Sequence, residues 1–191
     1  RMCYPECQLG VSFLTRVMSC PTKEAYKAVL HMIAYLYGQR HRGIRMRGER
    51  GAQLRAHCDA SNNPDRSDKC KAQGGYIIFL GDSPVCWGSK KVSHVGQSAQ
   101  HNEMMQVAVC SKAVTWIRFL LEEIGFTCHI IGPTVIENDN LGAVKLCRDD
   151  ILTPANCYYD KDMFFAKEAF EREITDPRWV SGDDNLADSF T

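Results

Sequence analysis

The sequence predicts an α/β domain in which a mixed five-stranded sheet is flanked by helices, preceded by an N-terminal helical appendage. Three observations predict it. Strand-like segments between residues 53 and 89 are separated only by turn and loop residues, which is typical of an antiparallel meander. The later segments alternate strand and helix, the order that builds parallel pairing. The first forty residues read as helical instead, so we divide the chain at residues 1–50 and 51–191.

The N-terminal part is predicted to contain a helix that begins after Thr22 and ends at Gly38. Thr22 is a suitable N-cap, and apolar residues then repeat at helical spacing. The basic stretch 39–47 follows. Its Arg40, Arg42 and Arg45 are candidates to track phosphates, and the alternative is a solvated connection between two domains.

The sheet-forming part begins with a predicted strand over 54–58 that ends at Asp59. A polar loop leads to a second strand over 75–80, a turn over 81–84, and an antiparallel third strand over 85–89. A long helix is predicted from Ser98 to Ile124. The remaining elements are expected in this order: a strand over 133–137, helices over 141–147 and 160–174, a strand over 178–180, and a final helix starting at 184–188.

Composition places the chain among globular proteins, since 45% of its 191 residues are hydrophobic and 24% are charged. No apolar run approaches the roughly 18 residues that span a bilayer, so no membrane partner is expected. The chain begins with Arg1 rather than Met and stops at Thr191, and we expect it to be a piece of something longer.

The ten cysteines include no C-x-x-C pair, and their spacing is irregular. A disulfide framework remains an alternative because the count is even. Cys86, Cys110 and Cys147 lie within apolar runs, however, which favours buried, reduced thiols. We therefore expect an intracellular location, either cytoplasmic or nuclear.

The formal net charge of zero hides a segregation of charge along the chain. Residues 1–57 contain ten Lys or Arg against three acids, a balance of +7, and the remainder holds 13 basic and 20 acidic residues, a balance of −7. A basic part beside an acidic part suits a protein that grips a polyanion with one and binds cations with the other. Ordinary variation of surface charge is an equally weighted interpretation.

Four acids stand where the fold does not require a carboxylate. Asp59 ends the first strand, Glu103 lies in the first turns of the long helix, Asp139 follows the fourth strand, and Asp188 starts the last helix. If the first and fourth strands are neighbours, Asp59 and Asp139 lie side by side and Glu103 reaches them from the helix. Like charges this close repel, so the cluster needs cations to persist. Two Mg²⁺ ions, with Mn²⁺ as a substitute, would suit phosphodiester hydrolysis.

Several blocks of the sequence, in the right order, resemble the ribonuclease H region of copia-type LTR retrotransposon Pol polyproteins. The blocks cover nearly the whole chain: Leu14–Met18, Pro21–Glu24, Tyr35–Gly38, Gly75–Gly81, Trp87–Lys91, Asn102–Glu103, Trp116–Leu121, Gly125–Phe126, Asp139–Asn140 and Leu186–Thr191. The resemblance implies a ribonuclease H-like fold and magnesium as cofactor. It identifies Asp59, Glu103, Asp139 and Asp188 as metal ligands, and residues 1–50 as the C-terminal edge of the reverse transcriptase.

The function implied is a metal-dependent endonuclease that cuts the RNA strand of RNA–DNA hybrids during reverse transcription. Its partners would be the hybrid and the reverse transcriptase portion of the same polyprotein. Two alternatives stay open: a catalytically weak or inactive nucleic-acid-binding scaffold, and a DNA-acting nuclease of the same fold. Cleavage with and without Mg²⁺ discriminates the first, and substrate choice the second.

The chain departs from the family's pattern at three places. Only Asp160 is kept of a stretch that precedes the late helix, and Ser61 stands where the family often has a second acid. Gly182-Asp183-Asp184 occupies the loop in which other ribonucleases H often place a histidine. These departures predict slow turnover, and we also expect an extension beyond Thr191 to raise activity.

Further residues have a functional and a structural interpretation. Lys90, Lys91 and Asn140 are candidates for nucleic-acid contacts, although a hairpin end and a helix cap would use the same residue types. Asn62 and Asn63 are likewise candidates for contacts to the sugar hydroxyls of the RNA strand, with a role as turn residues as the alternative. For the three tryptophans and for the histidines that flank the acids we expect structural positions: Trp87, Trp116 and Trp179 in the core, and His57, His94 and His101 at the surface or at strand ends.

Overall fold

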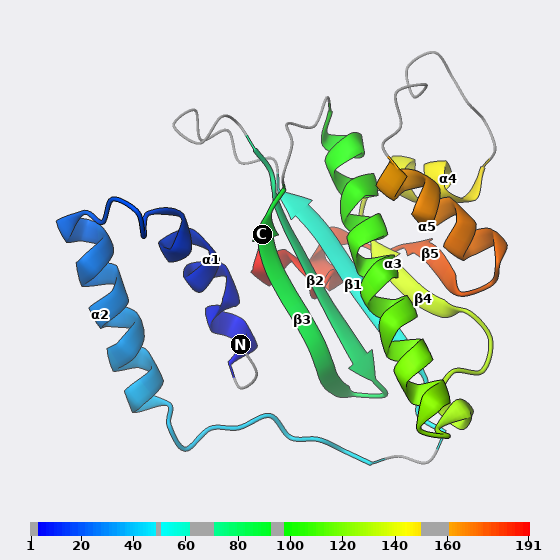
Figure 1. The fold of residues 1–191 in the computed structure, drawn as a ribbon, viewed down its shortest axis with the longest axis horizontal. Coiled ribbons are helices and arrows are strands. Elements are labelled where there is room, and N and C mark those ends of the chain that lie inside the picture. Colours follow the sequence, from blue (N-terminus) through cyan, green and yellow to red (C-terminus); the bar gives the residue numbers. More distant parts are fainter. Residues whose placement is uncertain (1–3, 49–50, 62–70, 93–97, 150–160) are drawn as a thin grey trace.

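A computed structural model of the chain describes residues 4–48, 51–61, 71–92, 98–149 and 161–191 (Figure 1). Its centre is one five-stranded sheet in the order β3-β2-β1-β4-β5. The mixed five-stranded sheet flanked by helices is therefore confirmed. The strands are β1 (Leu54–Ser61), β2 (Gln73–Leu80), β3 (Ser83–Lys91), β4 (Thr134–Asn138) and β5 (Thr175–Trp179).

The first three strands form an antiparallel meander, and the last two pair in parallel. β1 is antiparallel to β2, which is antiparallel to β3. Gly81 makes the tight β2–β3 turn with a φ of 59°, a conformation that glycine adopts without steric cost. β4 then pairs in parallel with β1, and β5 in parallel with β4. The chain thus returns to the open edge of β1, which becomes the central strand.

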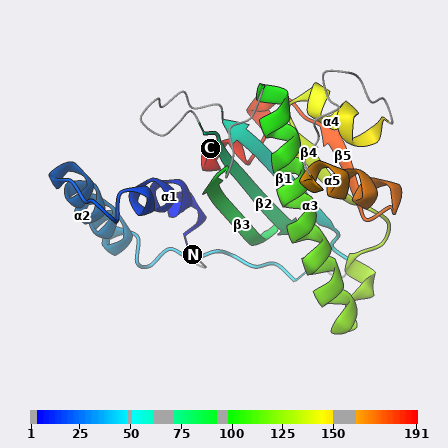
Figure 2. The same ribbon diagram turned by 45° about the horizontal axis from the view of Figure 1, so that its top comes forward.

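Three α-helices cover one face of this sheet (Figures 1 and 2). The side chain of Ser98 accepts from the His101 amide and starts the longest helix as its N-cap. Asn140 caps the next helix in the same way. The expected helices are confirmed as α3 (Ala99–Glu123) and α4 (Leu141–Arg148), and the part of the next that is described forms α5 (Lys161–Glu171).

The helix α3 is long and apolar enough to cross a bilayer, with a mean hydropathy of 1.3 in its most apolar window. Half of that window is buried inside the molecule, because the helix packs on β1, β2, α4 and α5. Its apolar character is therefore that of a core helix.

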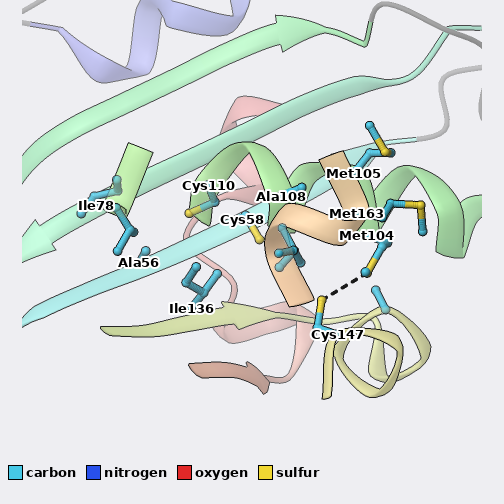
Figure 3. Packing of buried hydrophobic residues seen from close by; sticks show 14 of the residues in the cluster. Ala56, Cys58, Ile78, Met104, Met105, Ala108, Cys110, Ile136, Cys147 and Met163 are labelled. Atoms are coloured by element: carbon cyan, nitrogen blue, oxygen red, sulfur yellow. Dashed lines mark hydrogen bonds between the residues drawn. The ribbon is translucent and has the colours of Figure 1, made fainter. Parts of the chain in front are cut away.

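The main core lies between the sheet and these helices (Figure 3). Ala56, Ile78 and Ile136 come from three adjacent strands and are fully buried against α3. Val107 and Cys110 are the matching positions on the helix. Removing this apolar surface from water stabilises the layer by about 25 cal/mol per Å². A smaller core on the opposite face contains Ile77, Phe79, Trp87 and Phe190, with Ile44 packed against it.

The cysteines of the described residues are free thiols, and those in the core are closely packed. Cys147 donates to the sulfur of Met104 over 3.1 Å, a contact drawn in Figure 3. Burial raises the pKa of the Cys147 thiol to about 12. This thiol therefore stays protonated and unreactive at neutral pH.

The N-terminal segment contains two helices beside the edge strand β3 (Figure 2). After the short turn η1 (Pro5–Cys7), α1 (Gln8–Arg16) contacts β3, and α2 (Lys23–Gly38) packs on α1. Thr22 caps α2, and the helix ends at Gly38 as predicted. Several apolar side chains of α2 remain exposed, among them Tyr26, Leu30 and Ile33.

The C-terminal segment differs from the prediction. It contains two short 3₁₀ turns, η4 (Gly182–Asp184) and η5 (Asp188–Phe190), where we expected a helix. η5 lies behind the sheet, against β1 and β2 (Figure 1). Phe190 is buried in the smaller core, and this anchor holds the chain in one short turn. β5 also begins earlier than expected, at Thr175, because a proline at position 177 is tolerated on an edge strand.

Candidate metal centre and nucleic-acid interface

Three of the four acids singled out in the sequence meet at one end of the sheet. Asp59 comes from β1, Glu103 from α3, and Asp139 from the residue after β4. One carboxylate oxygen of each lies within 4.8 Å of the other two. Asp59 and Glu103 are both only 7% exposed. An arrangement of oxygen ligands this close, and this buried, is able to hold a hard divalent cation.

The local sequence explains how these side chains converge. β1 and β4 are parallel neighbours with His57 opposite Glu137, so Asp59 and Asp139 follow at the same level of the sheet. Glu103 lies on the same face of α3 as Val107, which is fully buried against the sheet. The helix therefore carries the Glu103 carboxylate to the strand ends.

Asn138 fixes the position of Glu103, a role that we did not predict from the sequence. Its side chain is fully buried, and its Nδ2 donates to Glu103 Oε2 over 2.9 Å and to the Cys58 carbonyl over 3.0 Å. Its Oδ1 accepts from the backbone amide of Asn140. One amide thus joins β4, β1 and α3 at the carboxylate cluster. A strand-end asparagine of this kind looks like an ordinary turn residue in the sequence.

Asp59 is held from the C-terminal segment. The hydroxyl of Thr191 donates to Asp59 Oδ2 over 2.5 Å. Asn185 Nδ2 lies 3.5 Å from Asp59 Oδ1 and donates to the Cys58 carbonyl over 3.2 Å. Thr191 was part of a block that carried the family resemblance, but neither residue was predicted to contact the acids.

The electrostatics of the cluster favour a bound cation. The pKa of Glu103 is raised to about 8, mainly by burial and also by the nearby Asp59 and Asp139 charges, while the Asn138 hydrogen bond opposes this shift. Burial also raises the pKa of Asp59, together with the charges of Asp139 and Asp188, while the Thr191 hydrogen bond opposes this shift. A divalent cation would compensate this repulsion between carboxylates.

Asp188 stands apart from the group of three. It is exposed at the start of η5, and it does not belong to the set of oxygens that lie within 4.8 Å of one another. Its charge nevertheless contributes to the raised pKa of Asp59, so it faces the cluster from the C-terminal side.

The predicted phosphate-binding residues divide between the two ends of the sheet. Lys90 of β3 pairs with Gly74 of β2, which in turn pairs with Ala60 of β1. This exposed lysine therefore lies two strands from Ala60, the residue after Asp59, and at the same level of the sheet. Lys91 lies next to it, level with the end of β1.

The basic stretch that contains Arg40, Arg42 and Arg45 reaches the opposite end. Its Arg47 amide donates to Ser83 Oγ, and Ser83 is level with Leu54. Five residues separate Leu54 from Asp59, which corresponds to about 17 Å along a strand. The three arginines are exposed, and Arg40 lies over the ring of Tyr37, with its guanidinium carbon 4.4 Å from the ring centroid.

Several structural expectations need correction. Trp87 is buried, but Trp116 is 63% exposed on α3, and Trp179 is 56% exposed with its indole nitrogen donating to the Asp139 carbonyl. His57 is buried rather than at the surface, with Nε2 3.1 Å from Glu137 Oε2. Asn140 has the helix-cap role noted above. Asn62, Asn63, His94 and Asp160 lie outside the described residues.

The comparisons with known proteins place the chain among transposon polyproteins. It is 32% identical over 187 residues to the retrovirus-related Pol polyprotein from transposon RE1 of Arabidopsis thaliana, and 23% identical to that from transposon TNT 1-94 of Nicotiana tabacum. These matches cover 98% of this chain but only 13% and 14% of the two polyproteins. No protein-family model matches the chain.

Solved structures that resemble the fold include ribonucleases H and viral protease-reverse transcriptases. An LC11-RNase H1 in complex with an RNA/DNA hybrid covers 72% of the chain and 93% of its own length, with a TM-score of 0.48 and 13% identity. A foamy viral protease-reverse transcriptase in complex with an RNA/DNA hybrid covers 87% of the chain and 20% of its own length, with a TM-score of 0.46 and 13% identity. Since these scores are low, the assignment depends on the sequence relatives. The chain is therefore a homologue of the retrovirus-related Pol polyproteins from transposons, and it corresponds to a segment of about 13% of their length.

Proposed function

We propose that this chain is the ribonuclease H domain of a copia-type retrotransposon Pol polyprotein, and that it cuts the RNA strand of RNA–DNA hybrids. The observation that carries the proposal is the buried group of Asp59, Glu103 and Asp139, whose oxygens lie within 4.8 Å of one another. The transposon relatives support the same conclusion, because the chain is 32% identical over 187 residues to a retrovirus-related Pol polyprotein.

The donor set fits magnesium better than a softer metal. All three side chains offer carboxylate oxygens, with no cysteine or histidine in the group. Asp188 would complete the set of four from the exposed side. Two divalent ions held this way would supply an activated water and stabilise the leaving oxygen.

The surrounding residues of the chain prepare the carboxylates. Asn138 donates to Glu103 Oε2 and thereby orients this carboxylate. Thr191 orients Asp59, and the Trp179 indole, by bonding to the Asp139 carbonyl, fixes the backbone from which the Asp139 side chain projects. Preorganised ligands of this kind avoid the cost of reorganisation on metal binding.

Basic residues on two parts of the surface would bind the hybrid. Lys90 and Lys91 lie at the level of the acid cluster, and the stretch of Arg40, Arg42 and Arg45 leads to the far end of the sheet. A nucleic acid that contacted both would need several base pairs. Such contacts fix register on the backbone, while contacts to 2′-hydroxyls distinguish the RNA strand.

The test is cleavage of an end-labelled RNA–DNA hybrid in Mg²⁺, beside Asp139→Asn and beside wild type in EDTA. We expect cutting of the RNA strand that both controls abolish, with duplex RNA and duplex DNA left intact. Cutting of duplex DNA would identify a DNA-acting nuclease. Hybrid binding without cleavage under Mg²⁺ or Mn²⁺, by folded protein, would contradict the proposal in favour of a binding scaffold.

A further inference from the structure

A chain of buried and partly buried hydrogen bonds connects the N-terminal helix α1 to the C-terminal turn η5. Its centre is Gln73, the first residue of β2, whose side chain is 1% exposed. Gln73 Nε2 donates to Ser12 Oγ over 3.1 Å and to Ser89 Oγ over 2.6 Å, and Gln73 Oε1 accepts from Arg16. Ser12 and Arg16 both belong to α1. The donors and the acceptor of this amide are therefore all used in bonds to residues of α1 and β3.

The direction of this chain is fixed by the chemistry of its members. Ser89 Oγ donates to the Phe190 carbonyl over 2.5 Å, and a carbonyl can only accept. A hydroxyl has one proton, so Ser89 must accept from Gln73, and the Arg16 guanidinium can only donate to the other side of the amide. The residue after that carbonyl is Thr191, whose hydroxyl donates to Asp59.

The backbone of η5 packs closely against β2. Phe190 packs with Ile77 and Trp87, and it is almost fully buried. A Cβ added at Gly75 would lie 2.5 Å from Phe190 Cβ and 3.1 Å from its carbonyl carbon. Packing therefore determines where the turn lies on β2, and the hydrogen bond from Ser89 orients the Phe190 carbonyl.

We propose that Gln73 is a positioning residue. Its hydrogen bonds couple the position of α1 to that of η5, and the position of η5 determines where Thr191 and Asp188 lie relative to Asp59. The metal-binding part of this inference rests on the proposed function. In consequence, α1 works as part of the nuclease unit, although the sequence predicts a domain division at residue 50.

The experiment compares Gln73→Met with Gln106→Met in the full chain. Gln106 is also buried, and its Nε2 donates to the Gly75 carbonyl over 3.0 Å from α3, on the other face of β2. Both changes remove one buried amide, but only Gln73 belongs to the hydrogen-bonded chain that leads through Ser89 to the Phe190 carbonyl. Ser89→Ala, which cuts the same chain at its next link, serves as a second variant.

The first readout is amide exchange by NMR at Phe190 and Thr191, whose amides bond to Ala187 and Asp188. We expect exchange about tenfold faster in Gln73→Met and Ser89→Ala, a factor that corresponds to ~1.4 kcal/mol, and no change in Gln106→Met. The second readout is binding of Mn²⁺ alone, followed by the EPR signal of the free ion. We expect about tenfold weaker binding in the two variants, the lower end of what loss of a ligand's partner costs.

Equal exchange at Phe190 and Thr191 in all three variants would overturn the inference, as would unchanged Mn²⁺ affinity in Gln73→Met. If wild type bound no Mn²⁺, the proposed function would fail instead. The exchange rates would still decide whether Gln73 holds the turn, since they require no metal.

Discussion

Asn138 and Glu103 are joined by a buried hydrogen bond of 2.9 Å, and the asparagine nitrogen that makes it also donates to the Cys58 carbonyl. One side chain thereby ties the ends of two parallel strands to the helix that brings the third carboxylate. The cluster is built around a neutral residue that has no ligand role of its own.

Replacing Asn138 should therefore cost more than replacing an asparagine that only caps a helix. Asn138→Ala leaves the Asn140 amide and Glu103 Oε2 without their Asn138 partner, and it removes one of the two side-chain hydrogen bonds to the Cys58 carbonyl. We expect a loss of ~2–4 kcal/mol in the free energy of unfolding. Asn140→Ala removes one cap bond and should cost about 1 kcal/mol. Urea denaturation of both variants measures the difference. Equal losses would mean that the buried amide is not the organising contact.

Glu103 should make the metal-free protein more stable at pH 7 than at pH 9. Its folded pKa of about 8 lies above its ordinary value of 4.5, because burial disfavours the charged carboxylate. Between these two pKa values the native state therefore holds a proton that the unfolded state lacks. The free energy of unfolding therefore rises as the pH falls from 9 to 7, by about 1 kcal/mol. Unfolding in EDTA at both pH values, with Glu103→Gln as the control, checks this. An equally steep pH dependence in Glu103→Gln would assign the effect to other groups.

Gly75→Ala should impair the site without touching a carboxylate. The added methyl would meet Phe190 at 2.5 Å, so η5 must shift away from β2 together with Asp188 and Thr191. We expect a fall in kcat of about tenfold or more, because small misplacements near reacting groups are costly. Gly43→Ala is the control, since an added Cβ there meets nothing within 4 Å. Unaltered kcat in Gly75→Ala would show that the turn tolerates displacement.

Lys90→Ala should weaken hybrid binding with little effect on kcat. Lys90 lies at the level of the acid cluster, and loss of one phosphate contact reduces the slope of log affinity against log salt by about 1. Binding to a labelled hybrid in EDTA at several salt concentrations measures this slope. Lys145→Ala, an exposed lysine on α4, provides the matched control. The same slope in both variants would remove Lys90 from the interface.

The order of elements and their types could be predicted because the local signals agree with the fold. Gly81, Ser98 and Gly38 mark a turn, a helix start and a helix end in the structure as they do in the sequence. The convergence of Asp59, Glu103 and Asp139 followed from the expectation that β1 and β4 are neighbours, and this pairing is present.

The rest of the site depends on contacts between distant segments, which periodicity does not encode. Thr191 bonds to Asp59 across 132 residues, and Asn138 to Glu103 across 35. The missing final helix has a similar cause, because burial of Phe190 against β2 outweighs the helical preference of the preceding residues. The apolar neighbours of Trp116 predict a core position, but α3 buries only one of its faces, and Trp116 lies on the exposed face.

The sheet order also has a consequence for synthesis of the chain on the ribosome. Ala56 of β1 pairs with Ile136 of β4, so the central strand waits for a partner that is made 80 residues later. At translation rates of about 5–20 residues per second this delay is roughly 4–16 s. During that time the meander presents an unpaired strand edge, which is a template for association with other chains. Co-expressed chaperones that cover this edge should therefore raise the yield of soluble protein.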